Sequence, residues 1–176
     1  MGKQAWVGLV RAINVGGTGK LPMSELAAAC QTVGLTAVKT YLASGNVVFG
    51  GGPSEAKIIA ALEAELSMRM GQPAAVLLRS ADALRDALAR DPFAHCEPSR
   101  TLIYFLPHAA DATLAATGQK NEQIAASGRE IFVHYPDGIG ESRLRISAAL
   151  VGTARNLNTV RKLEQMARAL DAGSGL

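Results

Sequence analysis

The most constraining feature of this sequence is a regular alternation between short apolar runs and helical stripes over its first 80 residues. Branched apolar runs of this length are typical of buried strands, and apolar residues recurring every three or four positions are typical of helices. Strands are expected at residues 6–13, 36–43, 46–50 and 74–79, and helices after Pro22 and after Ser54. This order, β-α-β-β-α-β, predicts an α+β protein with an N-terminal ferredoxin-like lobe over residues 1–80.

That topology predicts which loops come together. In a ferredoxin-like sheet the strand order is 4-1-3-2 and neighbouring strands are antiparallel, so the first strand lies beside the third. The Gly-rich loop at residues 14–20 and the Ser44-Gly45 turn then lie at the same end of the sheet. We expect these two loops to be spatial neighbours.

Residues 81–176 predict a smaller second α+β lobe that ends in a helix, packed on the first as one compact domain. A helix capped by Ser80 opens it, and runs at 101–107 and 128–135 are typical of strands. The Ala-rich stretch 111–127 favours a helix with a break near Gly118, and Ser142 begins a short amphipathic helix through Leu150. A last helix ends at Gly173.

Composition excludes several classes of protein. With 48% hydrophobic and 19% charged residues, the chain is globular rather than disordered. No apolar run reaches the roughly 18 residues that span a bilayer, and the first 17 residues lack the pattern of a secretory signal. We therefore expect a cytoplasmic protein with no membrane partner.

The pattern of cysteines and histidines indicates no metal site and identifies no cofactor. Cys30 and Cys96 are the two cysteines, too far apart in sequence for a disulfide framework or a Cys-rich zinc site, and Cys30 falls on the apolar stripe of a predicted helix. The three histidines have no metal-ligand spacing. His95-Cys96 is a possible nucleophile pair, but no catalytic residue is assigned, and whether the chain is an enzyme stays open.

Basic charge gathers toward the C-terminus. The net charge is +3, yet residues 143–168 contain six Lys/Arg and one acidic residue, a balance of +5. This segment could bind nucleic acid or a protein partner. The few aromatic residues, 5% of the chain, provide poorly for base stacking.

The loop NVGGTGKL at residues 14–21 links a predicted strand to a predicted helix, as a P-loop does, but it lacks the Walker A pattern. Its backbone N–H groups, beside Lys20 at a helix start, would favour an anion. The alternative is a flexible turn with a solvated lysine. Arg11 shares strand parity with Val7 and Leu9, on the side expected to face helices, where it either pairs with Glu25 or points into a site.

The segment TARNLNTVRKL at residues 153–163 crowds five polar residues before and into a helix start: Thr153, Arg155, Asn156, Asn158 and Thr159. Capping explains one or two of them. The surplus favours a recognition surface, and both readings stay open.

Five segments together resemble an uncharacterised bacterial family called domain of unknown function 1697. They are VRAINVGGTGKLPMSEL (10–26), TYLASGNVVF (40–49), DPF (91–93), IYFLP (103–107) and TARNLNTVRKLEQM (153–166). The resemblance implies two α+β lobes, the first ferredoxin-like, and no established activity. The sequence departs from the family pattern at Ala12, where Gly is usual, and at Leu157, where an aromatic residue is usual.

The candidate ligand-binding residues are the polar matches to that pattern: Arg11, Asn14, Gly16, Gly17, Lys20, Ser44, Asn46, Arg155, Asn156 and Thr159. They favour a small anionic, phosphate-bearing ligand held by the Gly-rich loop, the Ser44-Gly45-Asn46 turn and the TARN segment. Nucleic-acid or partner binding by residues 143–168 is the alternative.

Overall fold

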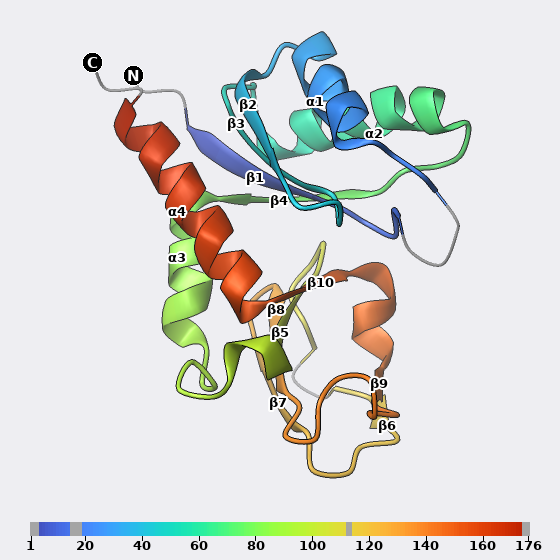
Figure 1. The fold of residues 1–176 in the computed structure, drawn as a ribbon, viewed down its shortest axis with the longest axis vertical. Helices are drawn as coiled ribbons and strands as arrows, with labels where there is room; N and C mark the ends of the chain where they lie inside the picture. Colours follow the sequence, from blue (N-terminus) through green and yellow to red (C-terminus); the bar gives the residue numbers. More distant parts are fainter. Residues whose placement is uncertain (1–3, 15–18, 112–113, 174–176) are drawn as a thin grey trace. The chain divides into compact units, whose positions relative to one another are not determined.

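The computed structural model describes residues 4–14, 19–111 and 114–173. In that part of the chain it is a mixed α+β protein with antiparallel sheets and four α-helices (Figure 1). The chain divides into two compact units. The first unit contains Met1–Leu84 and Leu163–Leu176, and the second contains Arg85–Lys162. The division falls within the helices α3 (Ala81–Arg90) and α4 (Leu157–Gly173), so the C-terminal part of the last helix belongs to the first unit.

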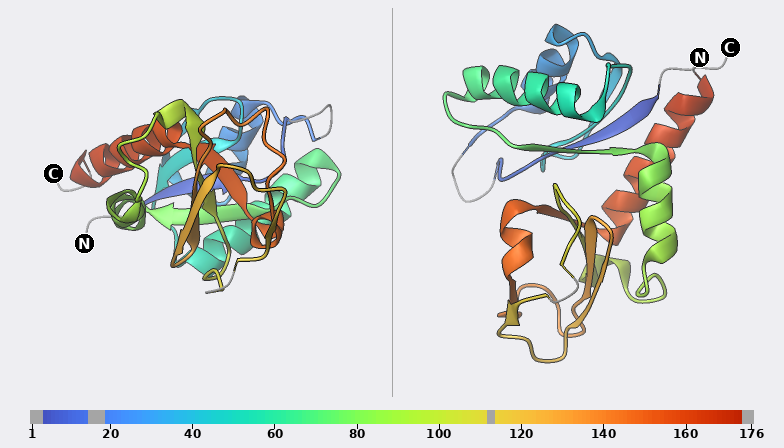
Figure 2. Two further views of the ribbon diagram at one scale, coloured as in Figure 1. Left: turned by 90° about the horizontal axis from the view of Figure 1, so that it is seen from below. Right: turned by 180° about the vertical axis from the view of Figure 1, so that it is seen from behind.

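The first unit is built on a four-stranded sheet in the order β2-β3-β1-β4, which is the predicted strand order. Its strands are β1 (Ala5–Val10), β2 (Thr36–Tyr41), β3 (Asn46–Gly50) and β4 (Val76–Ser80). Helices α1 (Met23–Thr32) and α2 (Glu55–Met70) cover one face of this sheet (Figures 1 and 2). Leu9 of β1 lies opposite Asn46 on one side and Leu77 on the other, which fixes the register.

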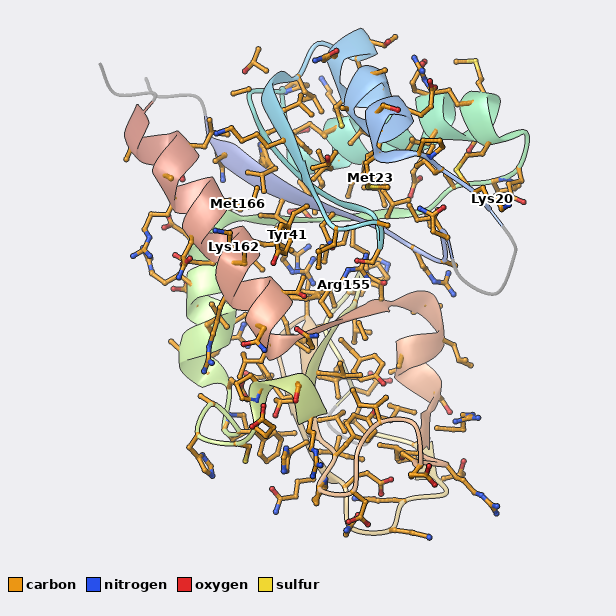
Figure 3. The ribbon with its side chains drawn as sticks, viewed as in Figure 1. Lys20, Met23, Tyr41, Arg155, Lys162 and Met166 are labelled. Atoms are coloured by element: carbon orange, nitrogen blue, oxygen red, sulfur yellow. The ribbon has the colours of Figure 1, made fainter. Side chains whose placement is uncertain are left out.

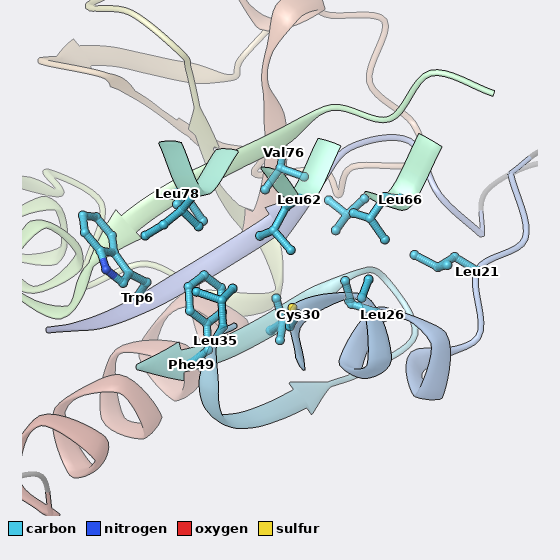
Figure 4. Packing of buried hydrophobic residues seen from close by; sticks show 14 of the residues in the cluster. Trp6, Leu21, Leu26, Cys30, Leu35, Phe49, Leu62, Leu66, Val76 and Leu78 are labelled. Carbon is cyan, nitrogen blue, oxygen red and sulfur yellow. The ribbon is translucent and has the colours of Figure 1, made fainter. Parts of the chain in front are cut away.

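The core of this unit lies between the sheet and its two helices. Leu26 and Cys30 of α1 and Leu62 and Leu66 of α2 are buried there (Figure 4). They share one apolar cluster with sheet residues such as Phe49. Fully burying a Leu or Phe side chain contributes roughly 1.5–3 kcal/mol, so this layer contributes much of the stability of the first unit.

Local signals set the ends of α2 as the sequence predicts. The Ser54 hydroxyl accepts a hydrogen bond from the Lys57 N–H at 3.4 Å, and Gly71 ends the helix with φ of +66°. Where α4 belongs to the first unit, the Asp171 carboxylate accepts the Ala5 N–H at 2.6 Å, which ties this helix to the start of β1.

The second unit contains an antiparallel sheet in the order β10-β5-β8-β7. Its strands are β5 (Thr101–Phe105), β7 (Gln123–Ser127), β8 (Glu130–His134) and β10 (Thr153–Asn156). A small second sheet pairs β6 (Ala116–Thr117) with β9 (Arg145–Ile146), and the 3-10 helices are η1 (Pro98–Arg100) and η2 (Ser147–Val151). Ile131 and Val133 of β8 are buried in its core.

Two predicted helices of this unit are wrong. Residues 116–127 carry β6 and β7, because Ser127 and Glu130 flank a two-residue hairpin turn that pairs this stretch with β8. Residues 142–150 carry β9 and most of the 3-10 helix η2 in place of an α-helix, and Leu144 and Ile146 are buried at a spacing of two, the period of a strand. A high alanine content led to the first of these two predictions, and an amphipathic pattern led to the second.

Candidate functional site

The two loops predicted to meet do meet at one end of the first sheet. The Val10 N–H, at the end of β1, donates to the Gly45 carbonyl in the β2–β3 turn at 2.8 Å. Gly45 has φ of +88°, and a Cβ added there would lie 2.7 Å from the Ile13 side chain. The segment that follows β1 therefore packs tightly against the hairpin turn.

Asn14 fastens the loop after β1 to its surroundings. Its Nδ2 donates to the carbonyl oxygens of Leu21 at 2.9 Å and Ala43 at 2.8 Å, and its Oδ1 accepts the Leu21 N–H at 2.9 Å. The Asn14 φ of +54° is left-handed, a conformation that Asn tolerates better than most residues. Both amide hydrogens are used by the fold, so Asn14 positions this edge.

Asn46 orders the hairpin turn from inside. It is fully buried, and its Nδ2 donates to the Tyr41 carbonyl at 2.8 Å and to the Ser44 hydroxyl at 2.9 Å. Both hydrogens of this amide are therefore used within the turn. Ser44 is exposed, so it is the predicted residue of this turn that lies at the surface.

The predicted cations of the edge flank the Gly-rich loop. Lys20 is exposed and lies two residues before Pro22, the N-cap of α1; Figure 3 shows it on the segment that leads to Met23. Arg11 is half-buried, and its backbone N–H donates to the Ala75 carbonyl at 2.9 Å. The predicted Gly16 and Gly17 lie outside the described residues.

The strand-parity argument for Arg11 is wrong. β1 ends at Val10, and Arg11 lies in a turn, because Ala12 adopts a left-handed φ of +52° that breaks the extended backbone. Trp6 and Val10 face the core under α1 and α2. Val7 and Leu9, whose parity Arg11 was predicted to share, do not belong to that core cluster. The carboxylate suggested as a partner, Glu25, binds Arg69 at 2.7 Å.

The TARN segment is a strand, β10, rather than the loop expected before a helix. It pairs with β5, with Arg155 opposite Ile103, because backbone pairing satisfies the N–H and C=O groups that a loop would leave to water. Arg155 Nη1 donates to the Thr153 hydroxyl and to the Ala154 carbonyl, each at 2.8 Å. Burial lowers the pKa of Arg155 to about 10, which leaves it positively charged at neutral pH.

Two further residues of this segment serve the start of α4. The Asn156 side chain accepts the Thr159 N–H at 2.9 Å, the hydrogen bond of a helix N-cap. Thr159 is buried, 7% exposed. The capping explanation therefore accounts for Asn156, and Arg155 is the charged residue of β10.

Sequence reasoning missed several buried charged residues, among them Arg79 and Asp91. Arg79 of β4 is 1% exposed, lies opposite Val7, and donates to the Leu78 carbonyl at 2.8 Å. The alternation of side chains along the run AAVLLR could have indicated this position. Leu78 faces the helix-covered core, so its neighbour Arg79 faces away from it. Asp91 is 7% exposed, in the DPF turn; the sequence singled out this turn only through the family resemblance, and nothing in it indicated that Asp91 is buried.

Two hollows in the second unit are lined by none of the predicted site residues. One, of about 400 Å³, lies beside β7 among small residues such as Ala125 and Ala126. The other, of about 280 Å³, is polar and includes Glu122. The Ser142 hydroxyl and the Lys120 N–H donate to the Glu122 carboxylate and lower its pKa, so the fold already uses this group.

No metal centre is apparent in the part of the chain that the structure describes: no group of three or more His, Cys, Asp or Glu side chains there could hold an ion. Cys30 is buried in the core, as predicted, and burial raises the pKa of its thiol to about 12. Among the described helices, none has the length and apolarity to cross a membrane.

The basic charge of residues 143–168 is partly used by neighbouring groups. Arg168 pairs with Glu164 at 3.4 Å, and Arg161 donates to the Ala94 carbonyl at 3.1 Å. Arg155 is half-buried, and desolvation lowers its pKa.

Comparison with known proteins gives a family and a fold. A family model described as "Protein of unknown function (DUF1697)" matches residues 4–132. Among solved structures, the conserved bacterial protein SP0830 from Streptococcus pneumoniae is similar, with a TM-score of 0.75 and 23% sequence identity, covering 93% of this chain and 98% of that chain. At this identity the likeness shows a shared fold. No curated protein matches the chain.

Proposed function

Since the chain belongs to the family of proteins of unknown function DUF1697, whose model covers residues 4–132, we propose a function from its own geometry: the first unit binds a small phosphate-bearing anion. The ligand lies at the edge where the loop after β1 meets the β2–β3 turn. Lys20 and Arg11 supply positive charge, and the exposed Ser44 hydroxyl supplies a hydrogen bond. In such an anion site, charge-assisted hydrogen bonds hold the phosphate oxygens.

The observation that carries this proposal is the fastening of the loop by Asn14. One amide group joins Leu21, in the segment that leads to α1, to Ala43, in the β2–β3 turn. A loop held at both points presents Lys20 from a defined position, which reduces the entropy lost when a ligand binds. Asn14 and Asn46 therefore position the edge, because their Nδ2 hydrogens are bonded within the protein.

The proposal includes the fold class of the first unit. Its element order β1-α1-β2-β3-α2-β4 and its sheet order β2-β3-β1-β4 support a ferredoxin-like lobe. In that topology the β1–α1 loop and the β2–β3 turn lie at one end of neighbouring strands. The predicted contribution of Arg155, Asn156 and Thr159 to the ligand stays a prediction.

A thermal-shift screen tests the proposal. Purified full-length protein is melted with inorganic phosphate, nucleotides and sugar phosphates, with chloride salts at matched ionic strength as the control. A ligand at a hundredfold excess over its Kd stabilises the folded state by about 2.7 kcal/mol, a readily measured rise in Tm. No stabilisation by any phosphate-bearing compound would contradict the proposal.

A parallel assay tests the alternative, which is nucleic-acid binding. Fluorescence anisotropy with labelled single-stranded and duplex probes is measured at low and moderate salt. Binding through residues 143–168 would weaken steeply as salt rises, because counterions released from phosphates drive it. We expect no such salt-dependent binding.

A further inference from the structure

Four strands lie at the edges of the two four-stranded sheets: β2 and β4 in the first unit, and β7 and β10 in the second. An edge strand offers backbone N–H and C=O groups to any extended chain, and natural proteins commonly block it with a charged residue, a proline or a bulge. β2 contains Lys39 and a shift of register, β4 contains Arg79, and β10 contains Arg155. β7 (QIAAS) has no charged residue and no proline, and its register with β8 is continuous. Among these four edges, β7 is therefore the one without such a block.

The pairing of β8 shows how its backbone groups are directed. Opposite residues of an antiparallel pair alternate between those that exchange two hydrogen bonds and those that exchange none. Just after β5, the Leu106 N–H donates to the Arg129 carbonyl at 2.9 Å, and this series continues at every second residue along β8. The odd-numbered residues of β8 therefore bond to β5, and the even-numbered residues bond to β7.

The outer edge of β7 consequently presents the backbone groups of two residues. The even-numbered residues of β8 lie opposite Gln123, Ala125 and Ser127, so these three form the hairpin ladder. The N–H and C=O groups of Ile124 and Ala126 point away from β8, and no hydrogen bond reaches them from the part of the chain that the structure describes. Two donors and two acceptors are open at this edge.

The hollow of about 400 Å³ lies along this open edge. Its volume falls within the roughly 300–1,000 Å³ that is usual for ligand pockets. Opposite β7 it is lined by small or apolar side chains, among them Ala110, Leu114 and Ala116. The Ala110 N–H donates to the Gly128 carbonyl at 2.9 Å, which joins this wall to the hairpin turn. Of the described residues that line the hollow, Asp111 is the charged one, and it is exposed.

We propose that this hollow binds an extended peptide of a partner protein, which adds a strand to β7 and places a basic residue beside Asp111. The peptide backbone exchanges hydrogen bonds with Ile124 and Ala126, the mode by which other sheets bind peptides through an open edge. Alternate side chains of a strand point to one face, so every second residue of the peptide is apolar and contacts Leu114 and Ile124.

The charge of the hollow favours such a peptide over a second copy of this chain. A copy that paired through its own β7 would bring the sequence QIAAS, which has no basic residue to face Asp111. A peptide with a lysine or arginine at one end supplies that charge. The occupant is therefore a basic, alternating apolar segment.

The test uses the full chain and one defined probe, the acetylated and fluorescently labelled peptide Lys-Val-Thr-Val-Thr-Val-Lys. We expect it to bind, and we expect one of two N-methylated forms, at the valine amides or at the threonine amides, to bind at least about tenfold more weakly, because a strand uses every second amide to pair with one neighbour. No binding at about 1 mM overturns the proposal. Equal affinities of the three peptides also overturn it, since side chains alone would then hold the probe.

Amide hydrogen exchange of the wild type tests the open edge directly. In the free protein the amides of Ile124 and Ala126 should exchange much faster than those of Ala125 and Ser127, and the probe should slow them about tenfold or more. Slow exchange of Ile124 and Ala126 in the free protein overturns the proposal. This result is decisive even where a variant fails to fold.

Two variants test the residues that hold the peptide. Ala126→Pro removes an outward N–H and no ladder bond, so it should abolish binding, whereas Ala126→Ser keeps the N–H and should bind as the wild type does. Asp111→Asn should weaken binding of the probe about two- to fivefold and leave a form with threonine at both ends unchanged. Unchanged binding by Ala126→Pro overturns the proposal. A wild-type dimer in sedimentation that Ala126→Pro dissociates also overturns it, since the occupant is then a second copy.

Discussion

The side-chain amide of Asn14 donates to the main-chain carbonyl of Ala43 at 2.8 Å, across 29 positions of sequence. This bond joins the loop that follows β1 to the hairpin between β2 and β3. The same nitrogen binds the Leu21 carbonyl, so one residue connects three segments of the first unit. The proposed anion edge depends on this connection.

Replacing Asn14 should loosen that edge. Asn14→Ala removes three hydrogen bonds, each with a net value of roughly 1 kcal/mol, and places Ala in a left-handed conformation. We expect the free energy of unfolding, measured by urea denaturation, to fall by about 2–3 kcal/mol. Asn158→Ala, at an exposed position of α4, is the control and should change it by less than about 0.5 kcal/mol. Equal effects of the two variants would contradict the role given to Asn14.

Gly45 tests how closely the hairpin packs on the loop after β1. Gly45→Ala would place a Cβ 2.7 Å from Ile13 at φ of +88°, whereas Gly138→Ala has φ of +91° and no atom within 4 Å. Both variants carry a left-handed penalty of roughly 1–2 kcal/mol, and only the first also has a steric clash. We therefore expect Gly45→Ala to have the lower Tm by several degrees. Similar Tm values would show that the hairpin can move away from Ile13.

Arg90 should stabilise the second unit through the β7–β8 hairpin. Its guanidinium donates to the Ser127 carbonyl at 2.6 Å and to the buried carboxylate of Glu130 at 2.8 Å. Arg85 lies on the same helix, but its ion pair with Asp86 is exposed and 3.6 Å long. Arg90→Ala should lower the free energy of unfolding by about 1–3 kcal/mol, and Arg85→Ala by less than about 1 kcal/mol. A reversed order would contradict this account.

The first unit was predictable because its signals are local. Ser54, Gly71 and the Ser44-Gly45 turn each mark a boundary through their own backbone chemistry, and the structure places α2 and the β2–β3 hairpin accordingly. Once the element order is known, the strand order brings the two loops together. The convergence of Asn14 with the hairpin could therefore be expected from sequence.

The second unit was less predictable because its elements depend on distant pairing. The strand β10 pairs with β5, about 50 residues earlier in the chain, and nothing within TARN indicates that pairing. Residues 123–127 form a strand that pairs with the adjacent β8, although the alanines of this stretch favour a helix. The burial of Asp91 likewise depends on how the chain packs around its turn, so no local pattern could reveal its environment.

The most direct test of the proposed function is the affinity of the best phosphate-bearing compound from the thermal screen, measured by isothermal titration calorimetry. Lys20→Ala should weaken binding at least tenfold, a change of about 1.4 kcal/mol, because it removes a charge at the loop. Lys39→Ala, at an exposed lysine of β2, should leave the Kd within twofold and controls for net charge. Equal affinity of Lys20→Ala and the wild type would contradict an anion site at this edge of the first unit.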